Sequence, residues 1–133
     1  MNAVIPVSPG ELFDKVTILE IKKRKIKDKR KLESVNKELA LLNISVNSML
    51  KKHKRKRASL MRQKAALKAV NLKLWSIEDS IRLMESRKDF GSAFVKKARE
   101  VYITNDKRSE IKNRINRLFG SAISEVKQYT KYR

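Results

Sequence analysis

Residues 32–50 read LESVNKELALLNISVNSML, and this stretch decides the fold. Its apolar side chains alternate three and four positions apart, at Leu32, Val35, Leu39, Leu42, Val46 and Met49. Such spacing places one narrow apolar stripe along a helix and is typical of a coiled-coil seam. The stretch therefore predicts a long helix that needs a partner along that stripe.

A second stripe of the same kind follows, at Leu60, Gln63, Leu67, Val70, Leu74, Ile77, Ile81 and Met84. Continuing the first spacing beyond Met49 leads through His53 and Lys56 into this second stripe, so the two are in phase. One interpretation is a single helix of about 58 residues, roughly 87 Å long, whose seam would be covered by a second copy in a homodimer. The favoured interpretation is an antiparallel coiled-coil hairpin, because folding back buries both stripes within one chain.

No strong helix breaker interrupts residues 11–90, because all three glycines and both prolines lie outside that range. Ser8 and Glu11 have the spacing of a capping box, and Pro9 suits the first helical position. We expect helices over residues 9–27, 29–50, 57–87 and 92–119, and a short helix over 121–129. The sequence thus predicts one all-α domain, residues 1–133, built on the hairpin and packed with flanking helices.

The charge is strongly basic, with 34 Lys and Arg against 14 Asp and Glu and a formal net charge of +20. Residues 39–77 contain no acidic side chain, and six of the seven residues 51–57 are Lys or Arg. Crowded like charges repel unless a polyanion or counterions screen them, which indicates nucleic acid or another polyanion as partner. The candidate polyanion-binding residues are Lys22, Lys23, Arg24, Lys25, Lys51, Lys52, Lys54, Arg55, Lys56 and Arg57.

The two basic runs would lie at opposite ends of a helix over residues 32–50, roughly 28 Å apart. Phosphates recur about every 3.4 Å along a strand, so an extended nucleic acid can touch both runs. No aromatic side chain lies inside the runs to stack on bases. We therefore expect a non-enzymatic protein that binds the nucleic-acid backbone independently of base sequence.

A second candidate site consists of polar and aromatic residues on the last two long helices: Asn71, Trp75, Glu78, Asp79, Arg82, Asn105, Asp106, Arg108 and Lys112. Helical spacing gathers most of them on one face of each helix. If the two faces meet, they form either a pocket for an anion or a sugar-like ligand, or a hydrogen-bond network that sets the packing register. Both interpretations stay open.

Other kinds of site find little support in the sequence. There is no Cys, and the only His, His53, lies in a basic run where neighbouring cations oppose metal binding. No residue set marks a nucleophile or a general acid and base, so we predict no catalytic residue, metal or cofactor. A small helical enzyme with an anionic substrate is the minor alternative.

The expected location is cytoplasmic. The N-terminus lacks the features of a signal peptide. The longest uncharged stretch that can be helical, Leu39–Leu50, has 12 residues, short of the roughly 20 that span a bilayer.

Six segments carry a family resemblance: SPGELFDKVTILEIK at 8–22, KELALL at 37–42, VNLKLWSIED at 70–79, VYITNDKR at 101–108, IN at 115–116 and GSAISEVK at 120–127. Through them the chain resembles a bacterial family classed only as a domain of unknown function. The resemblance implies a short helical, cytoplasmic domain without assigned activity. Some members occur near glycosyltransferase and cell-surface polysaccharide functions.

The resemblance suggests an alternative function, an interaction or scaffold domain. Its partner, for example a glycosyltransferase or a cell-surface polysaccharide enzyme, would dock on the polar face of the last two long helices. The family motif includes most of the second candidate site but differs around residues 45–60, where members are less basic. The basic run at 51–57 is therefore interpreted as an addition to the shared helical body.

Overall fold

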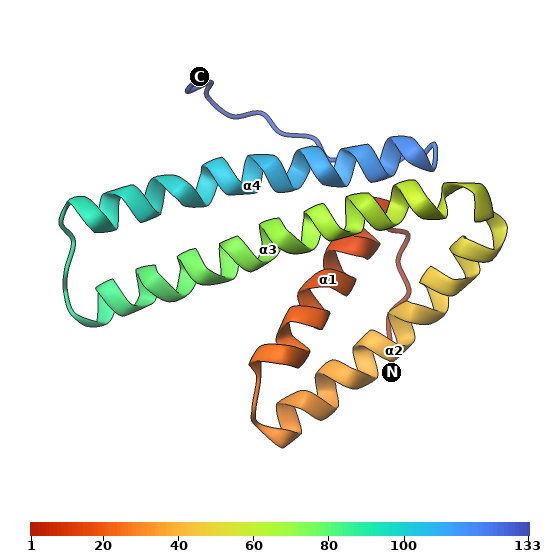
Figure 1. Ribbon diagram of the computed structural model, residues 1–133, viewed down its shortest axis with the longest axis horizontal. Coiled ribbons are helices and arrows are strands. Elements are labelled where there is room, and N and C mark those ends of the chain that lie inside the picture. Colours follow the sequence, from red (N-terminus) through yellow and green to blue (C-terminus); the bar gives the residue numbers. More distant parts are fainter.

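The computed structural model describes residues 1–133 and confirms the all-α class. It contains four helices, α1 (Pro9–Lys25), α2 (Lys29–Lys52), α3 (Arg57–Ser86) and α4 (Ser92–Leu118), and a 3₁₀ turn at Lys54–Lys56 (Figure 1). None of the helices combines the length and the apolar run that crossing a membrane requires.

Local side-chain signals set the helix starts. The Ser8 hydroxyl accepts a hydrogen bond from the Glu11 backbone N–H at 3.1 Å, and Pro9 occupies the first position of α1. The Asp28 carboxylate accepts from the Lys31 N–H at 3.0 Å and caps α2. Each cap satisfies a backbone donor that the helix itself leaves unpaired.

The chain turns at the basic run, as the hairpin interpretation expected, and does not continue as one long helix. The His53 ring packs edge-on against the Phe119 ring, with centroids 5.3 Å apart. The Lys56 ammonium lies 5.5 Å from the centre of the same ring. His53 and Lys56, the two residues of the run that continue the spacing of the stripes, thus attach the turn to the end of α4. The other cations of the run stay exposed.

The helix pairing differs from the expected coiled coil. From the turn, α2 and α3 diverge, and α1 lies in the angle between them (Figure 1). The pairs that pack are α1 with α2 and α3 with α4, and α1 also contacts both helices of the second pair. Thus α1 covers the stripe of α2 and the first part of the stripe of α3, and α4 packs along α3.

The composition of α1 explains this central place. Its buried residues lie on several sides of the helix: Leu12, Phe13, Asp14, Val16, Thr17, Leu19 and Ile21. Both predicted stripes contribute to the core that surrounds it, through Val35, Leu39 and Val46 of α2 and Leu60 and Leu67 of α3. A helix that is apolar on several sides is stable only where neighbours enclose it.

The expected short helix over residues 121–129 is absent. Gly120, with φ of 61°, ends α4 by donating its N–H to the Arg117 carbonyl, and Ser121 donates to the Asn116 carbonyl. This pattern of bonds reverses the chain direction. Residues 119–133, here called the C-terminal segment, then run back along α4 (Figure 1).

The same end pattern closes α3, but with Lys88 in the left-handed position at φ of 55°. The Lys88 N–H donates to the Glu85 carbonyl and the Asp89 N–H to the Met84 carbonyl. Because a side chain in this conformation is strained, we expect Lys88→Gly to raise the free energy of unfolding by about 1 kcal/mol. Urea denaturation checks this, and an equal gain with Lys88→Ala would attribute the effect to lost charge instead.

Candidate functional site

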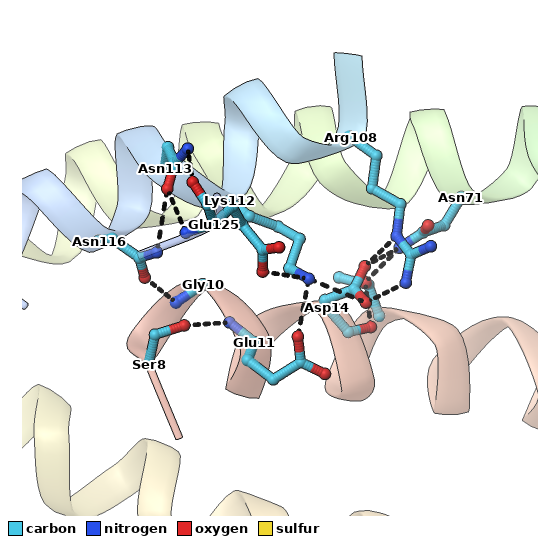
Figure 2. Close-up of polar contacts among 11 residues, drawn as sticks. Ser8, Gly10, Glu11, Asp14, Asn71, Arg108, Lys112, Asn113, Asn116 and Glu125 are labelled. Carbon is cyan, nitrogen blue, oxygen red and sulfur yellow. Dashed lines mark hydrogen bonds and ion pairs between the residues drawn. The ribbon is translucent and has the colours of Figure 1, made fainter. Parts of the chain in front are cut away.

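Asp14 is the centre of a buried ionic cluster between α1, α3 and α4. Only 1% of its surface is exposed. From α4, Arg108 donates through Nε to Oδ1 at 2.8 Å and through its terminal nitrogen to Oδ2. From α3, the Asn71 amide donates to Oδ1 at 3.0 Å (Figure 2). The carboxylate therefore ties the central helix to both of its neighbours.

The ionised form of Asp14 is favoured despite its burial. Burial raises the pKa of Asp14, but hydrogen bonds from Arg108 and Asn71 and the charges of Arg108 and Lys112 outweigh it, so the pKa lies below 3.8. The hydrogen bond to Asp14 raises the pKa of Arg108 above its ordinary value. A buried carboxylate without such partners would be strongly destabilising.

Lys112 extends the cluster to the C-terminal segment. Its ammonium lies 2.7 Å from Glu11 Oε2, 2.6 Å from Glu125 Oε1 and 4.0 Å from Asp14 Oδ2. Burial lowers the pKa of Lys112, but the hydrogen bonds to Glu11 and Glu125 outweigh it, and the pKa is raised. One lysine thus joins the start of α1, the end of α4 and the segment that follows.

A close backbone contact lies beside these ion pairs. The Gly10 N–H donates to Asn116 Oδ1 at 2.7 Å (Figure 2). A Cβ atom at Gly10 would lie 2.4 Å from the Lys112 carbonyl oxygen. Glycine is therefore required here because the start of α1 meets the backbone of α4 without room for a side chain.

The members of this Asp14 cluster are Glu11, Asp14, Asn71, Arg108, Lys112, Asn116 and Glu125. The only buried side-chain nitrogen or oxygen without a partner is Gln63 Oε1, outside the cluster. Every buried charge in the cluster is therefore satisfied internally, and the arrangement holds the helices in register. No three His, Asp or Glu side chains converge in a way that could hold a metal ion.

The structure separates the second candidate site into three parts. Asn71, Arg108 and Lys112 meet in the Asp14 cluster. Asn105 and Asp106 lie on α4 under the C-terminal segment, where Lys127 contacts both. On α3, Trp75 is half-buried, whereas Glu78, Asp79 and Arg82 are exposed, with Glu78 and Arg82 forming a surface ion pair at 4.0 Å. The later part of α3 lies apart from the Asp14 cluster because the α3–α4 hairpin extends beyond α1 (Figure 1).

The sequence interpretation missed the acidic members of the cluster, Glu11, Asp14 and Glu125. A signal was nevertheless present: Arg108 and Lys112 interrupt an apolar stripe, and buried cations require acidic partners. Asp14 is the acid that lies within the apolar part of α1.

The cationic candidates lie at the two ends of α2. The first basic cluster, the Lys and Arg residues of 22–31, surrounds the α1–α2 connection, and the second, those of 51–57, forms the α2–α3 turn. Every ion pair in the structure involves other cations. None of these fourteen side chains therefore lies within 4.0 Å of a carboxylate. The clusters include both ends of α2, which is about 36 Å long, so their near edges are separated by residues 32–50, roughly 28 Å.

Comparison with curated proteins and with solved structures gives no significant match. A family model described as "Family of unknown function (DUF6165)" matches residues 3–132. The match spans all four helices and the Asp14 cluster, and it confirms the resemblance to an uncharacterised domain. The chain therefore belongs to this family of unknown function.

Proposed function

We propose that the protein is a non-enzymatic, cytoplasmic nucleic-acid-binding protein. In this proposal the two basic clusters contact the phosphate backbone independently of base sequence. The observation that carries it is the concentration of fourteen cations without acidic partners at the two ends of one helix. Cations that are already paired inside a protein contribute little to binding an anion, whereas these are available.

Electrostatics favour such a partner. Side chains of like charge crowded at each turn repel one another, and a polyanion relieves that repulsion. Each phosphate that a Lys or Arg neutralises also releases condensed counterions from the nucleic acid, which drives binding. The proposal therefore accounts for charge that the fold itself does not use.

The spacing of the clusters supports an extended polymer as ligand. Cations of the two clusters lie from roughly 28 Å apart, at the near edges, to about 36 Å apart, at the two ends of α2, and this range includes one turn of B-form DNA, about 34–36 Å. One backbone of a straight duplex can therefore approach both clusters on the same side. Neither cluster contributes an exposed aromatic ring for base stacking, which supports sequence-tolerant contacts.

Neutralising the second basic cluster tests the proposal. In the variant, Gln replaces Lys51, Lys52, Lys54, Arg55 and Arg57, while His53 and Lys56 are kept because they pack on Phe119. We expect the affinity for a duplex of about two turns to fall about 100-fold at low salt, since several phosphate contacts are lost. Fluorescence anisotropy of the labelled duplex measures the change.

A matched control removes the same number of exposed cations elsewhere. It replaces Lys73, Arg87, Lys96, Arg99 and Arg114 by Gln, none of which forms an ion pair. We expect this variant, which has the same net charge, to bind the duplex nearly as tightly as wild type. Equal losses in both variants would show that binding follows net charge alone and would overturn the assignment to the clusters.

A second candidate function is partner docking on the arm of the α3–α4 hairpin that extends beyond α1. The observation that favours it is a set of apolar side chains, Leu83, Phe90 and Val95, each about half exposed on that arm. Under this alternative, a glycosyltransferase or polysaccharide enzyme binds there. Leu83→Ala with Val95→Ala would then abolish partner binding and spare nucleic-acid binding, the reverse of the five-substitution variant.

A further inference from the structure

The C-terminal segment is fastened to α4 and forms a second wall beside it. Asn113 exchanges two hydrogen bonds with the backbone of Glu125, at 2.8 and 3.2 Å. Farther along, the Lys127 ammonium lies 3.2 Å from Asp106 Oδ1, and the Tyr132 hydroxyl donates to the other oxygen of Asp106. The contacts step backward along α4, in agreement with the course of the segment in Figure 1.

A cleft of about 830 Å³ lies between this segment and α4. That volume falls in the range of small-molecule sites, about 300–1,000 Å³. All three tyrosines of the chain, Tyr102, Tyr129 and Tyr132, line it, and we call it the tyrosine cleft. The rings of Tyr102 and Tyr132 meet edge to face with centroids 5.0 Å apart. Lys127 lies over the Tyr129 ring at 5.6 Å and Arg133 over the Tyr132 ring at 5.4 Å, but each of the three rings keeps more than two fifths of its surface exposed, which leaves area for stacking.

The cleft also contains cations that have no carboxylate partner. Three of its cations are paired with carboxylates, namely Arg108, Lys112 and Lys127. The other three, Lys107, Lys131 and Arg133, lie more than 4.0 Å from every carboxylate. Among the acids that line the cleft, only Glu110 is unpaired, so an anion is attracted there.

We infer that the tyrosine cleft binds a nucleotide, a ligand that joins a flat heterocyclic ring to phosphate. The ring stacks on the tyrosines, and the phosphate pairs with Lys107, Lys131 and Arg133. A free mononucleotide and an unpaired nucleotide of a strand share this chemistry. The cleft contains no residue of either basic cluster, so the inference is independent of the proposed function.

Calorimetric titration of the full chain tests the ligand chemistry. The probes are UDP, uridine, inorganic phosphate and a uridine dinucleotide, which is too short to bridge the two basic clusters. We expect UDP or the dinucleotide to bind at least about tenfold more tightly than uridine or phosphate, because only they engage both the rings and the cations. Preference for UDP assigns a free nucleotide, and preference for the dinucleotide assigns a strand.

Two variants place the binding in the cleft. Lys131→Ala with Arg133→Ala, and separately Tyr129→Ala, are each expected to weaken nucleotide binding about tenfold. All three side chains are exposed and make no hydrogen bond, so the fold is retained. The control, Lys96→Ala with Arg99→Ala, changes α4 outside the cleft and is expected to bind as wild type does. Absence of nucleotide binding at about 1 mM, or unchanged binding in the cleft variants, would overturn the inference.

Discussion

Replacing Asp14 by Asn is expected to lower the free energy of unfolding by about 3 kcal/mol. The substitution removes the carboxylate that accepts from Arg108 and Asn71 and leaves the buried side of the Arg108 guanidinium without its counter-charge. The effect stays at the lower end of the range for buried ion pairs because 29% of the Arg108 side chain is exposed to water. Urea denaturation followed by circular dichroism measures it.

Glu78→Gln is the matched control, because it breaks the exposed ion pair with Arg82. Surface pairs contribute little, so we expect a change of less than about 0.5 kcal/mol. If Asp14→Asn is as mild as this control, the Asp14 cluster does not hold the helices together.

The acid dependence of stability follows from the same carboxylate. Because the folded pKa of Asp14 is lowered, its contribution is present above the unfolded pKa, about 3.9, and is lost as the pH falls through the folded value. In that window the native state binds fewer protons than the unfolded chain, so stability rises with pH. We expect this rise to be weaker in Asp14→Asn, as measured by urea denaturation below about pH 4.

Gly10→Ala is expected to destabilise the protein by about 3 kcal/mol, as severe overpacking does. The added Cβ would lie 2.4 Å from the Lys112 carbonyl oxygen and 2.8 Å from Asn116 Oδ1. The first of these atoms belongs to the backbone of a helix and cannot move alone, so α1 must shift away from α4. The shift would also lengthen the buried hydrogen bond from the Gly10 N–H to Asn116.

Gly91→Ala provides the comparison for Gly10→Ala under the same denaturation conditions. Its nearest neighbour would be Asp89 Oδ1 at 3.5 Å, an ordinary contact, and its φ of −75° suits any residue. We expect a loss of no more than about 1 kcal/mol, because Gly91 is the N-cap of α4 and Ala is a poorer N-cap than Gly. A loss at Gly10 no greater than at Gly91 would contradict the close approach of α1 and α4.

Local signals made much of the fold predictable. The capping box at Ser8 and Glu11 marked the start of α1, and the observed ends of the four long helices lie within two residues of the expected ones. The turn at the basic run was also expected. These features depend on neighbours in the sequence, so spacing and composition are sufficient to find them.

The choice of helix partners could not be predicted in this way. The stripes of α2 and α3 fit one another in spacing, but α1 is buried on several sides and takes the place between them. Helical spacing in the sequence places Leu12, Val16 and Leu19 on one apolar stripe of α1. The sequence interpretation therefore missed Phe13, which is fully buried, and with it the central position of the helix.

The candidate site was predicted in part for a similar reason. Asn71, Arg108 and Lys112 stood out as polar residues on helices, but their shared partner, Asp14, lies 57 or more residues away in sequence. The C-terminal segment has no helical period, and its course depends on contacts such as Asn113 with Glu125. Contacts between distant residues leave no periodic trace in the sequence.

The salt dependence of nucleic-acid affinity tests the central claim, that the two basic clusters bind the phosphate backbone, most directly. We expect the association constant of the wild-type protein for a duplex to fall about 1,000-fold or more between about 50 and 200 mM salt, as six or more phosphate contacts require. An affinity that does not change over this range, or no binding at the lowest salt concentration, would contradict the claim.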